Sequence, residues 1–268
     1  MTPPVVLTVA GSDPSGGAGI QADLKVFAAL GVYGASVVTA VTAQNSRDVF
    51  DVFPLPGNVV SGQLTAVLDD LPVVATKTGM LATADIAAAV SAKARAGALP
   101  HLVVDPVLAS STGRRLGVVA AIERLLPYAT VVTPNLDEAS ALVGWRIDTP
   151  TDMAGAASQL ASNGAKHVVI TGGDLPNPNE SIDAVWTDAG VRFLRSRRVE
   201  TRNTHGTGCA FSAAIAVRLA LGDAVPEALV FAKRYVYRAL VGARDWQLGS
   251  GHGPLDHFGW TTTYEEGL

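Results

Sequence analysis

Short apolar runs rich in β-branched residues alternate with helix-forming segments along most of the chain. The runs are apolar at consecutive positions, as expected of strands that are buried on both faces of a sheet. They lie at residues 5–11, 36–42, 73–80 (a strand and its following loop), 102–107, 130–135 and 166–171. Predicted helices lie between them at 20–30, 58–70, 83–97, 117–126, 136–143 and within 148–164. This order predicts an α/β fold with a mainly parallel central sheet, helices on both faces and right-handed crossovers.

Three further features complete the expected fold. Residues 50–55 form a short strand, and Pro54 places it at a sheet edge. Segments 181–187 and 191–198 alternate in polarity around Asp188-Ala189-Gly190 and predict a hairpin. A last helix is expected over about 225–241, followed by an irregular tail from Trp246. The chain has no repeat or long linker, so residues 1–268 are expected to form one domain, with a small polar flap near 109–117.

Composition narrows the class of protein. Hydrophobic residues make up 48% and charged residues 16% of the 268 positions, which predicts a large core. The net charge of −4 gives no sign of a nucleic-acid or anionic-membrane partner. No secretory signal or transmembrane run is recognisable, so we expect a cytoplasmic protein whose single cysteine stays reduced.

Polar side chains follow the predicted strand ends. In parallel α/β sheets, ligands bind outside the carboxyl ends of the strands. These ends carry Asp13, Gln44, Lys77, Met80, Asp105, Asn135, Glu138, Thr171 and Asp174. The nine residues are therefore expected to surround one ligand site.

A glycine-broken loop, Thr201-Arg202-Asn203-Thr204-His205-Gly206-Thr207-Gly208-Cys209, runs directly into an apolar helix. The free N–H groups and the dipole of a buried helix N-terminus attract anions, and glycine lets the backbone approach a phosphate closely. The same field is expected to lower the pKa of Cys209 and make its thiolate a base. The simpler interpretation is that Cys209 is a small buried residue. His205 is an alternative base or a structural residue.

Other signals narrow the chemistry. The glycine-rich loop at 12–19 matches neither the P-loop nor the dinucleotide-binding fingerprint. Asp105 and Glu138 supply hard oxygen ligands suited to Mg²⁺ carried on a nucleotide, although either alone could be a turn or helix-start residue. Such a cation beside an anion loop favours phosphoryl transfer.

Taken together, these motifs resemble those of the hydroxymethylpyrimidine and phosphomethylpyrimidine kinases of thiamin biosynthesis, in the ribokinase superfamily. The matching segments, in the expected order, are 10–25, 39–46, 77–81, 104–107, 133–139, 203–209 and 251–255. The resemblance implies a ribokinase-like three-layer α/β/α fold. It also implies MgATP-dependent phosphorylation of the pyrimidine alcohol and then of its monophosphate, by a homodimer.

The resemblance carries site residues with it. The family's pyrimidine pocket corresponds to Ala18, Asp23, Gln44, Met80, Val107 and Cys209. Cys209 then replaces the aspartate that most ribokinase relatives use as a base, within an anion hole formed by Gly206, Thr207, Gly208 and Cys209. Asp105 and Glu138 would lie near Mg²⁺, and the candidate nucleotide-binding residues are Asn135, Thr171, Thr207 and Lys233.

One position departs from the family pattern. Family members commonly carry a lysine before the paired glycines, where this chain has Thr171-Gly172-Gly173-Asp174. Lys233, Arg114 or Arg115 could supply the missing charge, or could be solvated surface residues.

Three other functions stay open at this point. A pyridoxal kinase, or an enzyme of dual specificity, would act on a similar ring alcohol. A thiol hydrolase would use Cys209 and His205 without ATP. A non-catalytic domain of the same fold would bind a metabolite and transfer nothing.

Overall fold

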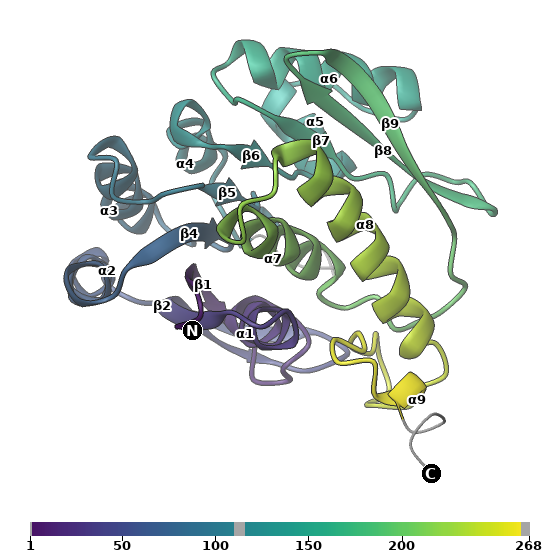
Figure 1. The fold of residues 1–268 in the computed structure, drawn as a ribbon, viewed down its shortest axis with the longest axis horizontal. Helices are drawn as coiled ribbons and strands as arrows, with labels where there is room; N and C mark the ends of the chain where they lie inside the picture. Colours follow the sequence, from purple (N-terminus) through teal and green to yellow (C-terminus); the bar gives the residue numbers. More distant parts are fainter. Residues whose placement is uncertain (1, 110–115, 264–268) are drawn as a thin grey trace.

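The computed structural model describes residues 2–109 and 116–263 (Figure 1). The strands are β1 (Val5–Ser12), β2 (Tyr33–Gln44), β3 (Val49–Pro54), β4 (Val73–Thr78), β5 (Val103–Val104), β6 (Val131–Val132), β7 (Val168–Ile170), β8 (Glu180–Thr187) and β9 (Gly190–Arg197). The helices are α1 (Gly19–Ala29), α2 (Gly57–Asp70), α3 (Ala84–Arg95), α4 (Val119–Glu123), α5 (Leu136–Val143), α6 (Pro150–Ser162), α7 (Thr207–Ala220), α8 (Val225–Gly242) and α9 (Trp260–Thr263). The predicted order of strands and helices is confirmed.

The described strands form one sheet in the order β3-β2-β1-β4-β5-β6-β7-β8-β9. The six strands from β2 to β7 are parallel, whereas β3 and β8 pair antiparallel with β2 and β7. The proline-bearing strand β3 lies at one edge, as predicted. The hairpin of β8 and β9 closes the other edge, with Gly190 in the left-handed conformation at its turn.

Alternating side chains of the central strands build two separate cores. Leu7, Val104 and Val132 pack under α2, α3, α4, α5 and α6. Their neighbours Val103 and Val131 point to the opposite face, under α1, α7 and α8. Figure 1 shows α7 and α8 side by side over that face. Strands buried on both faces explain why the sequence shows continuous apolar runs, and the three-layer architecture is confirmed.

Several predicted boundaries differ from the observed ones. Of the run 102–107, only Val103–Val104 is strand, although the carbonyl of Leu102 and the N–H of Asp105 still bond to neighbouring segments. The helix expected over 117–126 is α4 followed by a 3₁₀ turn, Leu126–Tyr128, which has proline in its first turn. The tail is not wholly irregular, since α9 lies within it. The expected flap falls mainly on residues 110–115, which lie outside the described residues. No helix in the described part of the chain is long and apolar enough to cross a bilayer.

The two-sided core predicts a clear contrast between leucines. Leu160 on α6 is fully buried, whereas Leu248 is 55% exposed. We expect Leu160→Ala to lower the free energy of unfolding by about 2–5 kcal/mol, through lost burial and a residual cavity. Leu248→Ala should change it by less than about 0.5 kcal/mol. Urea unfolding followed by circular dichroism measures both, and equal losses would contradict the core assignment.

Candidate active site

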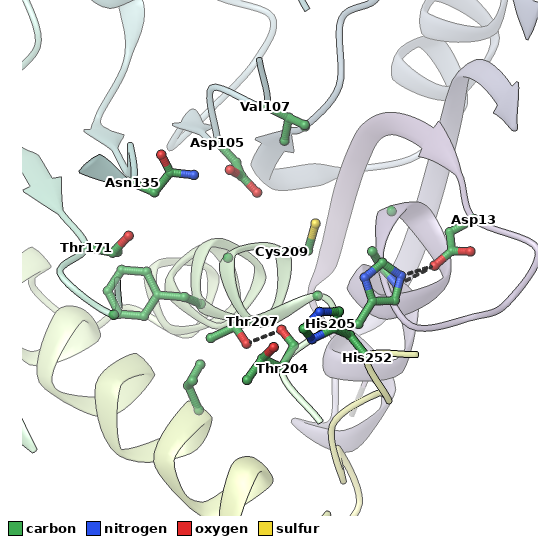
Figure 2. A pocket seen from close by; sticks show the side chains of 18 of the residues that line it. Asp13, Asp105, Val107, Asn135, Thr171, Thr204, His205, Thr207, Cys209 and His252 are labelled. Carbon is green, nitrogen blue, oxygen red and sulfur yellow. Dashed lines mark hydrogen bonds and ion pairs between the residues drawn. The ribbon is translucent and has the colours of Figure 1, made fainter. Parts of the chain in front are cut away.

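The carboxyl ends of the parallel strands open into one cavity of about 750 Å³. All nine residues expected at the strand ends line it, together with the loop that begins α7. Figure 2 shows Asp105, Val107 and Asn135 along one side, Cys209 at the start of α7, and His205 beside Asp13. The predicted convergence of these residues is therefore confirmed.

Glycines at the start of α7 let other groups approach its backbone closely. Gly206 caps the helix in a left-handed conformation, and a Cβ there would overlap the carbonyl of Gly17. A Cβ at Gly208, in contrast, would meet no atom within 4 Å, because this glycine faces the open cavity. No side chain caps the first turn. The N–H of Thr207 donates to the carbonyl of Thr204 at 3.2 Å, so Gly208 and Cys209 are the first-turn residues whose N–H groups can serve an anion.

The expected acidity of Cys209 is wrong. Burial of the thiol raises its pKa to about 12; Lys77 lowers it, the carboxylates of Asp105 and Asp23 raise it, and a hydrogen bond from the Gly19 backbone lowers it. The residue keeps some exposed surface and lines the cavity, but the surrounding protein excludes enough water for burial to be the largest influence on its pKa. Desolvation outweighs the helix N-terminus, so the resting thiol is protonated at neutral pH.

A buried ion group lies directly behind the thiol. Nζ of Lys77, on β4, lies 2.9 Å and 3.0 Å from the carboxylate oxygens of Asp23 and 3.5 Å from Asp105. Lys77 and Asp23 are both fully buried. Burial lowers the pKa of Lys77, but Asp23, Cys209 and Asp105 raise it by more. The net pKa is therefore above the ordinary value, and the ammonium stays charged. This cation beneath the cavity joins three elements of the fold.

Asp23 does not reach the cavity, which corrects its assignment to the pyrimidine pocket. Its oxygens accept from Lys77 and, at 2.6 Å, from the hydroxyl of Thr8, and it is 0% exposed. Burial raises its pKa, and Lys77 and Thr8 lower it. Asp23 therefore neutralises Lys77 and has no surface left for a substrate. The other expected pocket residues, Ala18, Gln44, Met80 and Val107, line the cavity.

Asn135 and Glu138 cap α5. The Asn135 side chain accepts from the N–H of Glu138, and the Glu138 carboxylate accepts from the N–H of Asn135, both at 2.9 Å. The second Glu138 oxygen faces the N–H of Leu108 at 3.4 Å. Burial and the nearby Asp105 raise the pKa of Glu138 to about 8. The structure thus gives Glu138 a capping role, while its metal role stays a prediction.

Asp105, the other proposed metal ligand, is also buried but does not cap a helix. Its Oδ2 lies 3.0 Å from the hydroxyl of Ser212, and it borders the cavity. No three histidine, cysteine or carboxylate side chains of the described chain gather into a metal cluster. The carboxylate of Asp105 is suited to a hard cation whose remaining ligands come from phosphate and water.

The loop that departs from the family pattern is held by charged residues. Arg198 donates to the carbonyls of Gly173, at 2.8 Å, and Leu175, at 2.9 Å, and also to that of Asn177. At the same side of the cavity, Lys233 forms an ion pair with Asp183 at 2.8 Å. Lys233 is thus at the cavity beside Thr171, whereas Arg114 and Arg115 lie outside the described residues.

Comparison with known proteins identifies the family. The family model described as phosphomethylpyrimidine kinase matches residues 13–256. The chain belongs to the phosphomethylpyrimidine kinase family. It is 47% identical to the hydroxymethylpyrimidine/phosphomethylpyrimidine kinase of Streptomyces coelicolor, over 97% of this chain and 96% of that protein. It is 48% identical to the chloroplastic thiamine biosynthetic bifunctional enzyme TH1 of Arabidopsis thaliana over 95% of this chain, but spans only half of that longer protein.

A solved structure supports the same fold. A pyridoxal kinase of Staphylococcus aureus, in complex with AMP-PCP and pyridoxal, matches with a TM-score of 0.88 and 37% identity. The match covers 98% of this chain and 96% of that one. The phosphomethylpyrimidine kinase fold of this chain is therefore ribokinase-like.

The sequence alone did not reveal what Lys77 and His205 do in this member of the family. Lys77 was expected only at a strand end; its burial was signalled by its place inside an apolar strand before Gly79. His205 was considered as a base, but its Nε2 lies 2.8 Å from Asp13 and 3.2 Å from the Gln44 amide. These partners are far apart in sequence, so local pattern could not identify them.

The buried ion group predicts a large stability effect. Lys77→Met leaves two buried carboxylates without their cation and should lower the free energy of unfolding by about 3–5 kcal/mol. Lys166→Met, at an exposed lysine, should cost less than about 0.5 kcal/mol. Denaturant unfolding at pH 7 compares the two, and a small loss in Lys77→Met would show that the ion group does not stabilise the fold.

The raised thiol pKa predicts slow alkylation. Cys209 is the single cysteine, so iodoacetamide reaction followed by mass spectrometry reports on it alone. Because only the thiolate reacts, the rate should rise about tenfold per pH unit from pH 7 to 10 without levelling. The same chain in denaturant should level near pH 9, as an ordinary thiol does. A folded-state plateau below pH 9 would contradict the raised pKa.

Proposed function

We propose that the protein is an ATP-dependent kinase that phosphorylates 4-amino-5-hydroxymethyl-2-methylpyrimidine and then its monophosphate, to the diphosphate, in thiamin biosynthesis. The observation that carries the proposal is the meeting, in one cavity, of the uncapped start of α7 with Asp105 and the amide of Gln44. These are an anion site, a hard oxygen donor and a group that can recognise a heterocycle. Family membership supports the same substrates.

The nucleotide is proposed to lie on the side of the cavity formed by β6, β7 and α8. Asn135, Thr171, Thr207 and Lys233 border that side, with the phosphates directed at Gly206 and Gly208. Asp105, with Glu138 behind it, would hold Mg²⁺ together with the phosphates; when bound, this ion neutralises phosphate charge. Lys233 is proposed to supply part of the charge that family members draw from the lysine absent at Thr171.

The pyrimidine is proposed to lie between β2, β4 and α7. Met80 and Val107 offer apolar surface, Ala18 leaves room for the ring, and Gln44 can pair with a ring nitrogen and the exocyclic amine. This places the hydroxymethyl oxygen near Cys209 and the amides of α7. These amides would stabilise charge on the transferring phosphoryl group.

One site can serve both transfers. In the first, an alcohol must lose its proton, and we assign Cys209 to accept it. Only the thiolate can accept this proton, so the first transfer is proposed to proceed through the small ionised fraction of Cys209. Because phosphoryl transfer has a loose transition state in which the proton is lost late, the demand on this base is modest. In the second, the acceptor is a phosphate that is already ionised, and no base is required.

The competing functions are weighed by the same geometry. A pyridoxal kinase is a second candidate because a solved pyridoxal kinase matches nearly the whole chain. A thiol hydrolase is disfavoured, since His205 directs Nε2 to Asp13 and Gln44 and the thiol pKa is raised. A non-catalytic binding domain is disfavoured by membership of a family of kinases.

A coupled ATPase assay with product identification tests the proposal. Hydroxymethylpyrimidine should yield mono- and diphosphate, and pyridoxal should react at least tenfold more slowly. Cys209→Ala should lower kcat of the first step about 10²- to 10⁴-fold and that of the second less than about fivefold. The wild-type first step should also accelerate toward pH 10, because the base must be ionised. Exclusive phosphorylation of pyridoxal, or no ATP consumption, would overturn the proposal.

Two further elements belong to the proposal. We also propose that residues 1–268 form one kinase domain and that the active species is a homodimer, as the resemblance implies. Light scattering of the purified chain measures the assembly directly.

A further inference from the structure

Three polar side chains from distant segments form a chain of contacts at one wall of the cavity. Asp13 follows β1, Gln44 ends β2, and His205 precedes α7. Nε2 of His205 lies 2.8 Å from Oδ2 of Asp13 and 3.2 Å from the terminal amide nitrogen of Gln44. Figure 2 shows the imidazole directed at Asp13. A single ring nitrogen therefore has two partners.

Asp13 determines which atom carries the proton. Its Oδ1 accepts from the backbone N–H and the hydroxyl of Ser15, and its Oδ2 accepts from the N–H groups of Gly17 and Ala18. Burial raises the pKa of Asp13, but the hydrogen bonds from His205, Ser15 and Ala18 outweigh it and lower the pKa to about 2. The carboxylate is ionised and can only accept, so Nε2 of His205 must be the donor.

The proton on His205 then restricts Gln44. An amide nitrogen facing Nε2–H would place two donors against each other at 3.2 Å. The two ends of a glutamine amide have nearly the same shape and exchange by a half-turn. With the carbonyl oxygen toward His205, the single Nε2–H can be shared between Asp13, at 2.8 Å, and Gln44 as a bifurcated hydrogen bond, and the NH₂ group turns away from His205. In the described residues, Gln44 makes no other side-chain hydrogen bond that would oppose this orientation.

The imidazole is itself held on two sides. The backbone N–H of His205 donates to the carbonyl of Gly253 at 3.0 Å, in the C-terminal tail. Its ring packs so closely on Gly17 that a Cβ there would overlap Cδ2. The side chain is only 14% exposed. The ring is therefore fixed, and its donor points along a fixed direction.

We propose that Asp13 and His205 are positioning residues that set the Gln44 amide with its NH₂ group toward the cavity, where it selects a substrate ring presenting a hydrogen-bond acceptor. This inference rests on the proposed function. In hydroxymethylpyrimidine, the ring nitrogen beside the amino-bearing carbon would accept from NH₂. The exocyclic amine would donate to the second lone pair of the carbonyl oxygen, whose first lone pair is used by His205. Asp13 and His205 thereby contribute to substrate choice without contacting the substrate.

Two substitutions of similar size separate positioning from packing. His205→Gln keeps a side-chain N–H donor within reach of both partners, whereas His205→Leu removes it. We expect His205→Leu to raise KM for hydroxymethylpyrimidine about tenfold, the value of one hydrogen bond. His205→Gln should stay within about threefold of wild type, and KM for ATP within twofold in both. His101→Asn, at a histidine before β5 that does not line the cavity, is the control.

A substrate analogue tests the orientation itself. The oxo analogue, in which a carbonyl replaces the amino group and the neighbouring ring nitrogen carries a proton, reverses the donor–acceptor pattern and places N–H against the NH₂ of Gln44. Wild type should discriminate against it at least tenfold in kcat/KM, and His205→Leu should discriminate less than about threefold, because its Gln44 amide can rotate to match the reversed pattern. Thermal melting by circular dichroism verifies that each variant is folded.

The outcomes separate this inference from the proposed function. If wild type does not phosphorylate hydroxymethylpyrimidine, the proposed function fails. If it does, but His205→Leu retains wild-type KM and discrimination, the positioning role is wrong. Equal losses in His205→Leu and His205→Gln, or equal rises in both KM values, would likewise overturn it in favour of packing. Should His205→Leu not fold, a tenfold KM rise in His205→Gln contradicts the inference on its own.

Discussion

A buried cation underlies the site. Lys77 joins β4 to α1 through Asp23 and to β5 through Asp105, and none of the three has room for bulk water. An isolated charge at this depth would not survive, so each member requires the others. The polar side chains that border the cavity therefore rest on a buried layer in which every charge is paired. Asp105 belongs both to this ion group and to the cavity wall, so it contributes to stability and to the proposed chemistry.

Hydrogen bonds within the protein hold the loops of the site in place without a ligand. Asn135 and Glu138 satisfy the start of α5, and Asp13 satisfies the turn before α1. The start of α7 differs from that of α5, because no side chain caps it. Gly208 and Cys209 of its first turn line the cavity. This contrast between α5 and α7 supports the start of α7 as the place for phosphate.

Sequence pattern predicted the parts of this arrangement that follow from local chemistry. Continuous apolar strands fixed the three layers, and the polar residues after them identified the cavity wall, because parallel strands bring their carboxyl ends together. The acidity of Cys209 and the place of Asp23 could not be predicted in this way. Both depend on desolvation and on Lys77, which is more than fifty residues away from Asp23 and from Cys209 in the sequence. The electrostatic field at a helix start can be predicted from the local sequence. The burial of a thiol cannot, because it depends on tertiary packing.

The tail that fixes His205 has a consequence for synthesis. Gly253 accepts from the backbone of His205, Pro254 forms a bridge with the same residue, and Asn203 donates to carbonyls at Ala243 and Trp246. The wall that begins at residue 13 is thus completed by residues translated some 240 positions later. A nascent chain still held in the ribosome exit tunnel lacks this closure. The wall around His205 is therefore complete only once the segment around Gly253 has been synthesised and has folded back onto it.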